Sequence, residues 1–358
     1  MNKIIFGDCR DIMRQLASEG VKVQMCVTSP PYFGLRDYGT SSWEGGDSDC
    51  NHSISMPTKW NDPKRGTSVL RPEVSHRGGD SSHCHLCGAK RIDLQIGLEE
   101  TPEEYIEAMV EVFRCVKDIL ADDGVLWVNI GDSYAANIRQ YGSKNAGELT
   151  NKSKGVLTDF KKKRPAGYKE KDLMGIPWML AFALRADGWY LRQDIIWHKP
   201  NPMPESVQDR CTKAHKYIFL LSKSQKYFYD NESIKVPVKE DWGTRDRTNG
   251  KYHNEGTGLQ PHGGLEKSYD MANKRSVWTV NTKPYSGAHF AVFPEELIEP
   301  CILAGSRVGD VVFDPFMGSG TTAQVAQQLG RKYLGCELNP DYKTLQDKRV
   351  AQTSLELI

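Results

Sequence analysis

The stretch VVFDPFMGSGTTAQVAQQLG, Val311 to Gly330, decides the fold because it joins an apolar run, a glycine turn and a helix-forming segment. Val311–Phe313 is short, apolar and β-branched, which predicts a buried strand. Gly318 and Gly320 allow a sharp turn and a close approach of the backbone to a ligand. Thr321–Leu329 predicts a helix, whose first N–H groups have no partner within the helix. We therefore expect a strand, turn and helix unit that binds a ligand at the turn.

The next predicted strand, Tyr333–Glu337, ends in a carboxylate that can accept hydrogen bonds from both hydroxyls of a ribose. A nucleotide P-loop is not supported, because no lysine precedes Thr321. The dinucleotide pattern GxGxxA fits Gly318 to Ala323, whereas S-adenosylmethionine would use the same ribose carboxylate and needs no phosphate cradle. The unit thus predicts a nucleoside-containing cofactor and leaves NAD and S-adenosylmethionine open.

Strands and helices alternate at both ends of the chain, which predicts an α/β fold with a parallel sheet. The further expected strands are Lys3–Gly7, Val21–Val27, Val125–Ile130, Tyr190–His198 and Tyr217–Leu221. The further expected helices are Arg10–Ser18, Thr101–Leu120, Gly175–Asp187 and Pro294–Ala304, and Thr101 is expected to cap its helix.

Composition narrows the class of protein. The 358 residues carry a net charge of +1, so a nucleic-acid binder would need a local basic patch. No apolar run reaches the about 18 residues of a membrane helix, and the N-terminus has no apolar signal core, so we expect a cytoplasmic protein. Nine cysteines in such a chain predict free thiols or metal ligands rather than disulfides.

The stretch TSPPYFGLRDYG, Thr28 to Gly39, follows the expected strand with two consecutive prolines. These prolines remove two backbone donors and restrict two φ angles, which makes a stiff hook at the carboxyl end of a strand. In α/β sheets this is also where ligands bind. Tyr32 can stack on a planar base, and the oxygens of Ser29 and Pro30 can accept from an exocyclic amino group. The hook therefore predicts catalysis by positioning.

At this point the sequence resembles a known family. TSPPY, DPFMGSGTT and the glutamate of LGCELNP are similar to the DNA methyltransferases that modify N6 of adenine or N4 of cytosine, and the motif order resembles their circularly permuted beta class. The resemblance implies a Rossmann-like S-adenosylmethionine methyltransferase sheet. It also implies transfer of a methyl group to the exocyclic amino group of a base flipped out of double-stranded DNA.

The resemblance also assigns residues. It implies a catalytic hook of Ser29, Pro30, Pro31 and Tyr32. It implies that the cofactor contacts Asp8, Thr28, His289, Phe290, Asp314, Phe316, Gly318, Ser319, Gly320, Thr321 and Glu337. In this set Asp8 would contact the adenine of the cofactor, whereas His289, Phe290 and the nearby Phe293 would cover its methionine end. The alternatives are a helix cap for Asp8, a core role for Tyr32 and a surface role for His289.

Ser29 bears on the target base. Family members often carry Asp or Asn at this position, and serine is more typical of the N4-cytosine enzymes, so cytosine is slightly favoured. Serine also precedes PPY in adenine enzymes, which keeps N6 of adenine open.

Two close pairs, Cys50-Asn-His52 and Cys84-His-Leu-Cys87, predict a structural Zn²⁺ site with three cysteines and one histidine. The segment between the pairs is too polar to order itself, so a metal would stabilise it. Three further histidines compete as the fourth ligand, namely His76, His83 and His85.

The expected domain organisation follows from these segments. Residues 1–40, 92–235 and 286–358 form the catalytic core, 41–91 a zinc-binding insertion, and 236–285 a target-recognition region. The basic loop 139–172, with KKKR at 161–164, is expected to contact DNA. The resemblance leaves open a homodimer and a cognate restriction endonuclease.

Two other functions compete with this one. An NAD-dependent oxidoreductase would use GSGTTA but would leave the hook, the cysteine pairs and the basic segments unexplained. A non-catalytic, zinc-bearing DNA-binding module would not need the hook.

Overall fold

The computed structural model describes residues 1–34, 40–52, 59–61, 68–70, 83–135, 165–237, 270–282 and 293–356, with the backbone alone at 59–61, 68–70 and 352–356. Within these residues an eight-stranded sheet forms the centre of the molecule, in the order β1-β14-β13-β2-β7-β9-β8-β12. In that order the strands are Lys3–Phe6, Lys332–Glu337, Val311–Asp314, Val23–Thr28, Leu120–Ile130, His215–Ser222, Tyr190–His198 and Val277–Thr279.

Most neighbouring strands of this sheet are parallel, as the alternation of strands and helices predicts, but β9 is an exception. This strand runs antiparallel to both β7 and β8. The reason is local, because the chain joins β8 to β9 without a crossover helix, and such a connection returns the chain in the opposite direction.

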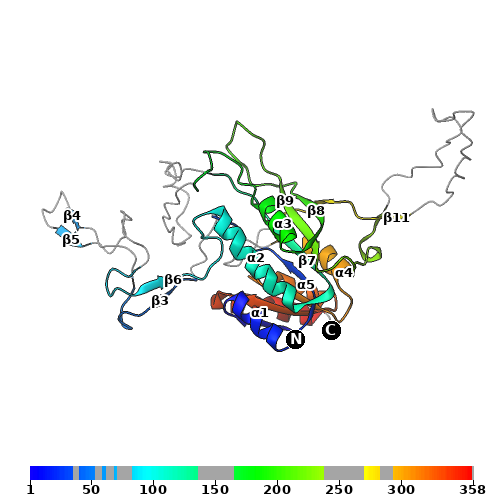
Figure 1. The fold of residues 1–358 in the computed structure, drawn as a ribbon, viewed down its shortest axis with the longest axis horizontal. Helices are drawn as coiled ribbons and strands as arrows, with labels where there is room; N and C mark the ends of the chain where they lie inside the picture. The colour runs from blue at the N-terminus through cyan, green and yellow to red at the C-terminus, as the bar shows by residue number, and fades with distance from the viewer. Residues whose placement is uncertain are drawn as a thin grey trace, which may run out of the picture.

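Helices cover both faces of the sheet (Figure 1). On one face lie α1 (Cys9–Ser18), α2 (Pro102–Ile119) and α3 (Ile176–Ala186), and on the other lie α4 (Glu295–Gly305) and α5 (Thr321–Gln328). The strand β7 shows why both faces are covered. Its Leu126 and Val128 pack under the first layer and its Trp127 packs under the second, so alternate side chains enter two apolar cores.

The predicted helices and strands are confirmed to within a few residues. The helix α2 begins with the expected cap, because the Thr101 side chain accepts from the Glu104 N–H and the Glu104 side chain accepts from the Thr101 N–H. In the central body the three-residue β12 and α6 (Lys343–Glu356), which packs on α5, were not predicted, and neither were the smaller strands and 3₁₀ helices described next. No helix in the described part of the chain has the length and apolarity to span a bilayer.

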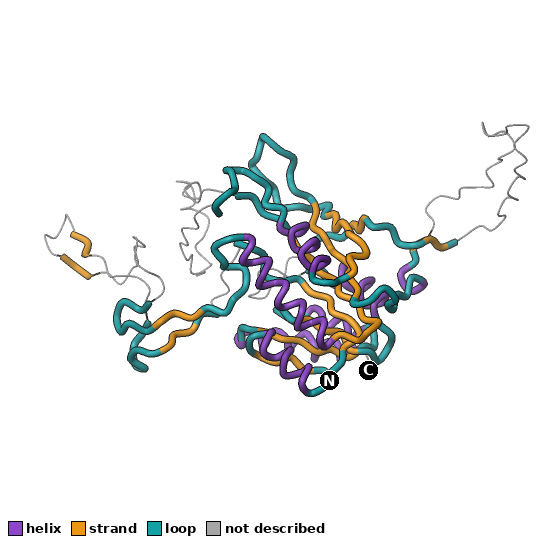
Figure 2. The backbone as a smooth tube through the Cα atoms, in the orientation of Figure 1, coloured by secondary structure: helices purple, strands orange, loops and turns teal. Residues whose placement is uncertain are grey.

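The smaller strands extend away from this body (Figure 2). β3 (Ser42–Glu44) pairs antiparallel with β6 (Lys90–Ile92), and β4 (Lys59–Asn61) pairs with β5 (Ser68–Leu70). β10 (Val236–Pro237) pairs with β11 (Met271–Ala272). Two short 3₁₀ helices complete the description, at Glu232–Ile234 and Pro340–Tyr342.

The strands β13 and β2 are parallel neighbours whose following helices lie on opposite faces of the sheet, α5 on one and α2 on the other. In an open α/β sheet this reversal leaves a crevice at the carboxyl ends of the two strands. The glycine turn leaves the end of β13, and the proline hook leaves the end of β2. The two stretches that the sequence singled out therefore start from adjacent strand ends.

Candidate functional site

A buried carboxylate joins the proline hook to the glycine turn. Asp314, at the end of β13, is 1% exposed. Its oxygens accept hydrogen bonds from Thr28 Oγ1 at 2.6 Å, Thr322 Oγ1 at 2.6 Å and the Phe316 N–H at 3.0 Å. Thr28 ends β2 and Thr322 lies in the first turn of α5, so one side chain ties together two strands, a loop and a helix.

The environment of Asp314 sets its protonation. Burial raises the pKa of this carboxyl to about 6, although the donors from Thr28, Thr322 and Phe316 favour the charged form. At neutral pH the carboxylate is charged and has no exposure to water that would replace a lost donor. The three donors are therefore needed to keep it stable in the fold.

The glycine turn is held against α6 and β14. Gly318 and Gly320 have φ angles of +53° and +87°, which favour glycine. The Gln346 side chain donates to the Gly318 carbonyl at 2.7 Å, and a Cβ on Gly320 would come within 3.4 Å of the Gln346 backbone. The turn thus approaches α6 closely, and its shape is fixed by contacts on both sides.

Glu337 lies beside this turn at the end of β14. It is 8% exposed, and its two oxygens accept from the Gly318 N–H at 2.7 Å and the Asn339 N–H at 2.8 Å. Burial raises the pKa of its carboxyl to about 7. Each carboxylate oxygen has two lone pairs, so both oxygens can still accept a hydroxyl. These remaining acceptor positions fit the two hydroxyls of a ribose.

Asp8 has the capping role that the sequence left open. It is the N-cap of α1, and its carboxylate accepts from the Arg10 N–H at 2.8 Å and from Arg10 Nη2 at 2.5 Å. The adjacent Gly7 N–H donates to the Glu337 carbonyl at 2.9 Å. Asp8 therefore lies next to the strand end that carries Glu337, and capping does not remove it from that neighbourhood.

The proline hook is held by side chains from neighbouring elements. Tyr105 of α2 donates its hydroxyl proton to the Pro31 carbonyl at 2.9 Å. Asn129, which is 5% exposed near the end of β7, has its Nδ2 3.4 Å from Ser29 Oγ, and its buried Oδ1 has no hydrogen-bond partner among the described residues. These contacts fix the backbone that presents Ser29 and Pro30.

Tyr32 packs partly on the apolar core, but its hydroxyl is engaged in polar contacts. Lys216 Nζ donates to the Tyr32 hydroxyl at 2.9 Å and lies 4.3 Å from the centre of its ring, while Ser29 Oγ lies 3.3 Å from the same hydroxyl. Burial raises the pKa of Tyr32 to about 12, so the phenol stays protonated. A Cβ on Gly131 would lie 3.0 Å from the ring, so a larger residue there would require the ring to shift by a few tenths of an ångström.

The remaining predicted residues are placed as follows. Ser319 and Thr321 are buried in the turn, and Thr321 Oγ1 accepts from Arg349 at 2.6 Å. Phe316 is half-buried, and Phe293 packs on the core under α4. His289 and Phe290 lie outside the described residues, as do most of the basic loop 139–172 and most of the segment 236–285.

Sequence reasoning missed several residues that hold the site, namely Tyr105, Asn129, Gly131, Lys216, Thr322 and Gln346. Thr322 could have been found, since it follows the glycine turn directly. The others reach the site only through the order of the strands, which carries no local signal.

The two cysteine and histidine pairs come together beside the β3–β6 ribbon. The ligand atoms of Cys50, His52, Cys84 and Cys87 all lie within 4.8 Å of one another. Cys50 Sγ is 3.9 Å from Cys84 Sγ, and Cys87 Sγ is 3.2 Å from His52 Nδ1. Tetrahedral bonds of about 2.3 Å would place two sulfurs about 3.8 Å apart. The geometry therefore fits a four-ligand metal site.

Two of the rival histidines, His83 and His85, are not part of this cluster. Among the described residues the group that could hold a metal contains neither His83 nor His85, and His76 lies outside those residues. The turn that carries Cys84 and Cys87 is closed by a hydrogen bond from the Gly88 N–H to the Cys84 carbonyl at 2.9 Å.

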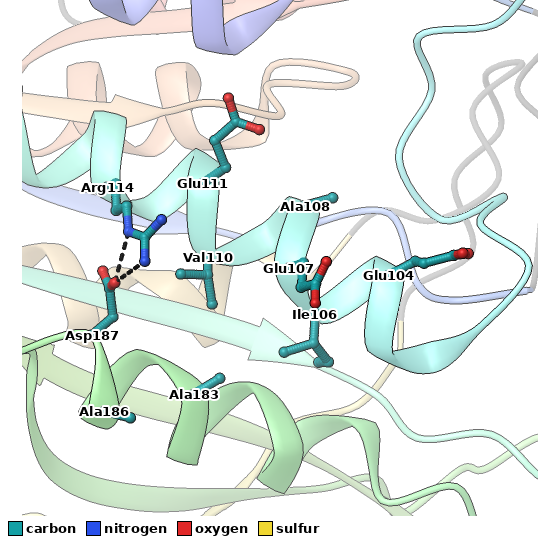
Figure 3. Close-up of a pocket in the computed structure, with 10 residues that line it drawn as sticks. All are labelled: Glu104, Ile106, Glu107, Ala108, Val110, Glu111, Arg114, Ala183, Ala186 and Asp187. Atoms are coloured by element: carbon teal, nitrogen blue, oxygen red, sulfur yellow. Dashed lines mark hydrogen bonds and ion pairs between the residues drawn. The ribbon is translucent and has the colours of Figure 1, made fainter. Parts of the chain in front are cut away.

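A groove lies between α2 and α3 on the outer face of the first helical layer (Figure 3). Acidic side chains from α2 line it, among them Glu104, Glu107 and Glu111, and the Arg114–Asp187 ion pair closes one part. This charge would repel a polyanion, so the groove is a poor candidate for contact with nucleic acid.

We predict that Thr28→Val destabilises the protein by about 1–3 kcal/mol, because it leaves the buried Asp314 carboxylate short of one donor. The folded-state pKa of Asp314 is raised, so the stability that this carboxyl contributes is present at low pH and is lost as the pH rises through about 6. Above that pH the carboxyl is charged and depends more strongly on its donors. The loss of stability caused by Thr28→Val should therefore be larger at pH 8 than at pH 5. Urea unfolding measures it, and Thr212→Val, at an exposed threonine, is the control. Equal stability of the two variants would contradict the role of Asp314.

Comparison with known proteins gives one matching family model, described as DNA methylase, over residues 23–348. The Type II methyltransferase M.SmaI of Serratia marcescens is 41% identical over 348 residues, which are 97% of this chain and 90% of that protein. The Type II methyltransferase M.Cfr9I of Citrobacter freundii is 41% identical over 336 residues, 94% of this chain and 83% of that protein.

Two solved structures share the fold. The PvuII DNA methyltransferase, titled cytosine-N4-specific, matches with a TM-score of 0.53 and 15% identity over 97% of this chain and 85% of that one. A DNA modification methylase from Thermus thermophilus, solved in complex with S-adenosyl-L-methionine, matches with a TM-score of 0.52 and 20% identity over 99% of this chain and 94% of that one.

Proposed function

Because this chain belongs to the DNA methylase family that modifies N4 of cytosine or N6 of adenine, we propose that it methylates N4 of a cytosine flipped out of duplex DNA. The family makes it a site-specific Type II DNA amino-methyltransferase that uses S-adenosylmethionine. The choice of base, the flipping step and the residues that act are the proposal. The NAD-dependent oxidoreductase that the glycine pattern left open has no support from any of these relatives.

The observation that carries the proposal is the bond from Thr28 to Asp314 at 2.6 Å. It joins the end of the hook strand to the start of the glycine turn. A ligand held at the turn and a base held by the hook would then share one crevice. Such an arrangement is what direct transfer between two bound molecules requires.

We assign the cofactor to the glycine turn and the strand ends beside it. Bound S-adenosylmethionine supplies a methyl group on a sulfonium, which is electrophilic. Glu337 would accept the ribose hydroxyls, and the turn at Gly318–Gly320 lets the backbone approach the ligand. The proposed set is the predicted one, Asp8, Thr28, His289, Phe290, Asp314, Phe316, Gly318, Ser319, Gly320, Thr321 and Glu337. Within it, Thr28 and Asp314 shape the site, since their polar side-chain atoms bond to each other.

The hook would hold the target base by two kinds of contact. Ser29 Oγ and the Pro30 carbonyl accept hydrogen bonds from the exocyclic amino group, so that its nitrogen lone pair points toward the methyl carbon. Tyr32 stacks on the base, and Pro31 keeps the hook stiff. No covalent bond to the protein is needed, because the contribution of these residues is orientation.

Ser29 is the basis for preferring cytosine. Its hydroxyl lies near the Asn129 amide. Because this hydroxyl is neutral, it is a weaker acceptor for the amino group than a carboxylate would be. N6 of adenine remains the alternative, because a hydroxyl accepts from either amino group.

The domain organisation that we propose is the one expected from the sequence. Residues 1–40, 92–235 and 286–358 would form the catalytic core and 236–285 the target-recognition region, with DNA contacts from 139–172. The relatives named above are Type II methyltransferases, so we also propose that a cognate restriction endonuclease accompanies this enzyme. A homodimer is an expectation from the beta class alone.

We propose that Cys50, His52, Cys84 and Cys87 bind a structural Zn²⁺ within the insertion 41–91. Four protein ligands leave no open position for chemistry. Close packing supports an ordered cluster, since a Cβ on Gly46 would lie 2.8 Å from Cys87 Sγ. A bound metal would hold together two chain segments that pair only through the short β3–β6 ribbon in the described part of the insertion.

Tyr32→Ala should lower the rate of plasmid methylation at least about 100-fold, because the base loses its stacking partner and its orientation. Purified protein, plasmid DNA and S-adenosylmethionine are incubated, and sequencing for modified bases gives the base, its position and the recognition site. Tyr190→Ala, at a tyrosine 45% exposed at the far end of β8, is the control. Unchanged methylation by Tyr32→Ala would refute the assignment of the hook as the active site. N6-methyladenine in the product would show that the target base is adenine and not cytosine.

We predict that the affinity for S-adenosylmethionine rises between pH 6 and pH 8, because only the ionised Glu337 accepts both ribose hydroxyls. The pKa of this carboxyl is raised to about 7, so it is mostly neutral at pH 6 and mostly charged at pH 8. Calorimetric titration across this range measures the change. Glu337→Gln should bind more weakly and without this dependence, and a wild-type affinity that is constant with pH would count against the assignment.

Removal of metal should lower the melting temperature of the wild-type protein, and Cys84→Ser should lower it without added chelator. Cys211→Ser provides the control, since Cys211 is exposed and outside the cluster. Elemental analysis should find about one zinc per chain in the wild type and in Cys211→Ser. Absence of zinc from protein purified without chelator would exclude the site.

A further inference from the structure

Three lysines gather at the same edge of the sheet as the proline hook. Lys199 follows the carboxyl end of β8, and Lys213 and Lys216 lie at the amino end of β9. The Lys199 N–H donates to the Ala214 carbonyl at 2.8 Å, which joins the two segments. Because β8 is parallel to β2 and β7 in direction, this edge is also where the hook begins.

The three ammonium groups are half-buried and have close contacts with neutral groups. Lys213 Nζ donates to the Asp132 carbonyl at 2.8 Å, and Lys216 Nζ donates to the Tyr32 hydroxyl at 2.9 Å. Lys199 Nζ lies 4.6 Å from the centre of the Trp197 ring, and Lys216 Nζ lies 5.7 Å from it. Aromatic rings and neutral oxygens stabilise a cation without cancelling its charge.

The nearby carboxylates are directed to other partners. Asp132 accepts from the N–H groups of Gly175 and Ile176 at the start of α3, at 3.1 and 3.2 Å. Glu205 is paired with Arg210 at 2.5 Å. Both still favour the charged form of Lys213. Among the described residues, Lys199, Lys213 and Lys216 outnumber the two carboxylates, so the charge there is positive on balance.

Burial and mutual repulsion lower the pKa values of the clustered lysines. Burial, together with the charges of Lys216 and Lys213, lowers the pKa of Lys199 to about 7. Burial also lowers the pKa of Lys213 and of the adjacent His215. An anion placed among the ammonium groups would relieve this repulsion.

We propose that Lys199, Lys213 and Lys216 bind one phosphate of the DNA backbone, the phosphate next to the flipped nucleotide. The inference rests on the proposed function, because a base held by the hook must bring its own phosphates to this rim. Lys216 contacts both Tyr32 and the phosphate, so it couples the grip on the backbone to the position of the stacking ring. The acidic groove on the outer face of α2 is unsuited to this role.

The test compares Lys199→Gln/Lys213→Gln with Lys22→Gln/Lys332→Gln, which removes the same charge from the opposite end of the strands. Lys216 is kept, so the contact to Tyr32 is undisturbed. The probes are DNA duplexes that contain the recognition site found by sequencing. Their backbone is either unmodified or carries one neutral methylphosphonate, on one side or the other of the target nucleotide. Affinity is measured at several salt concentrations, and titration with S-adenosylmethionine confirms that the variants fold.

One of the two methylphosphonates should weaken binding by the wild type about tenfold. The double variant at the cluster should show most of this loss with unmodified DNA. The methylphosphonate should weaken its binding clearly less than it weakens the wild type, because only Lys216 then contacts the phosphate. The slope of log affinity against log salt should fall by about 1 in that variant, as expected for one phosphate contact, and should stay unchanged in the control.

Equal losses in both double variants would overturn the inference, as would a methylphosphonate that weakens the wild type and the cluster variant to the same degree. A second arm titrates inorganic phosphate alone against melting temperature. Protection of the wild type with no effect of either methylphosphonate would assign the cluster to free phosphate and reject the DNA contact. These outcomes are distinct from failure of the proposed function, in which the wild type leaves DNA unmethylated.

Discussion

The organisation of this site depends on one buried carboxylate. Asp314 accepts hydrogen bonds from the last residue of β2, from the loop after β13 and from the first turn of α5. A charged group without access to water is stable only while its donors stay in place, so these elements cannot separate at little cost. The constraint joins a stretch near the N-terminus to one near the C-terminus, Thr28 to Asp314. It therefore holds next to each other two segments that are far apart in the sequence.

Around Asp314 the glycine turn and the proline hook are both held rigidly, and positive and negative side chains lie on different parts of the surface. The glycine turn is fixed by Gln346 and by Glu337, and the hook is fixed by Tyr105 and by its own prolines. Both segments are thus held in place by contacts within the protein, which suits the catalysis by orientation that we propose. Positive charge collects at the strand ends near the hook, whereas the outer surface of α2 is acidic, and this difference would direct a polyanion toward the hook.

Much of this architecture could be read from the sequence, because its signals are local. The strand, turn and helix around Gly318, the hook at Ser29 and the cap at Thr101 each depend on a few adjacent residues. The grouping of Cys50, His52, Cys84 and Cys87 was also expected, since each close pair is visible in the sequence. The structure brings these four side chains together.

The features that were missed are those set by the order and direction of strands. The sequence predicted the strand β9 but not its antiparallel direction or its neighbours. The contact of Lys216 with Tyr32 was therefore missed, because Lys216 reaches the ring from a strand that is distant in sequence. Gly131 had no signal either, because its small size matters only once the Tyr32 ring lies beside it. Such contacts depend on tertiary packing, to which local propensity is blind.

The claim that cofactor and base share one crevice is tested most directly with a bisubstrate compound. This compound carries the adenosine and amino acid parts of the cofactor joined by a short linker to the amino nitrogen of cytosine. Two adjacent sites would make the second binding event intramolecular, so the compound should bind at least about 100-fold more tightly than its cofactor half alone. Affinity no greater than that of the half would contradict the account, because the hook and the glycine turn would then not open onto one site.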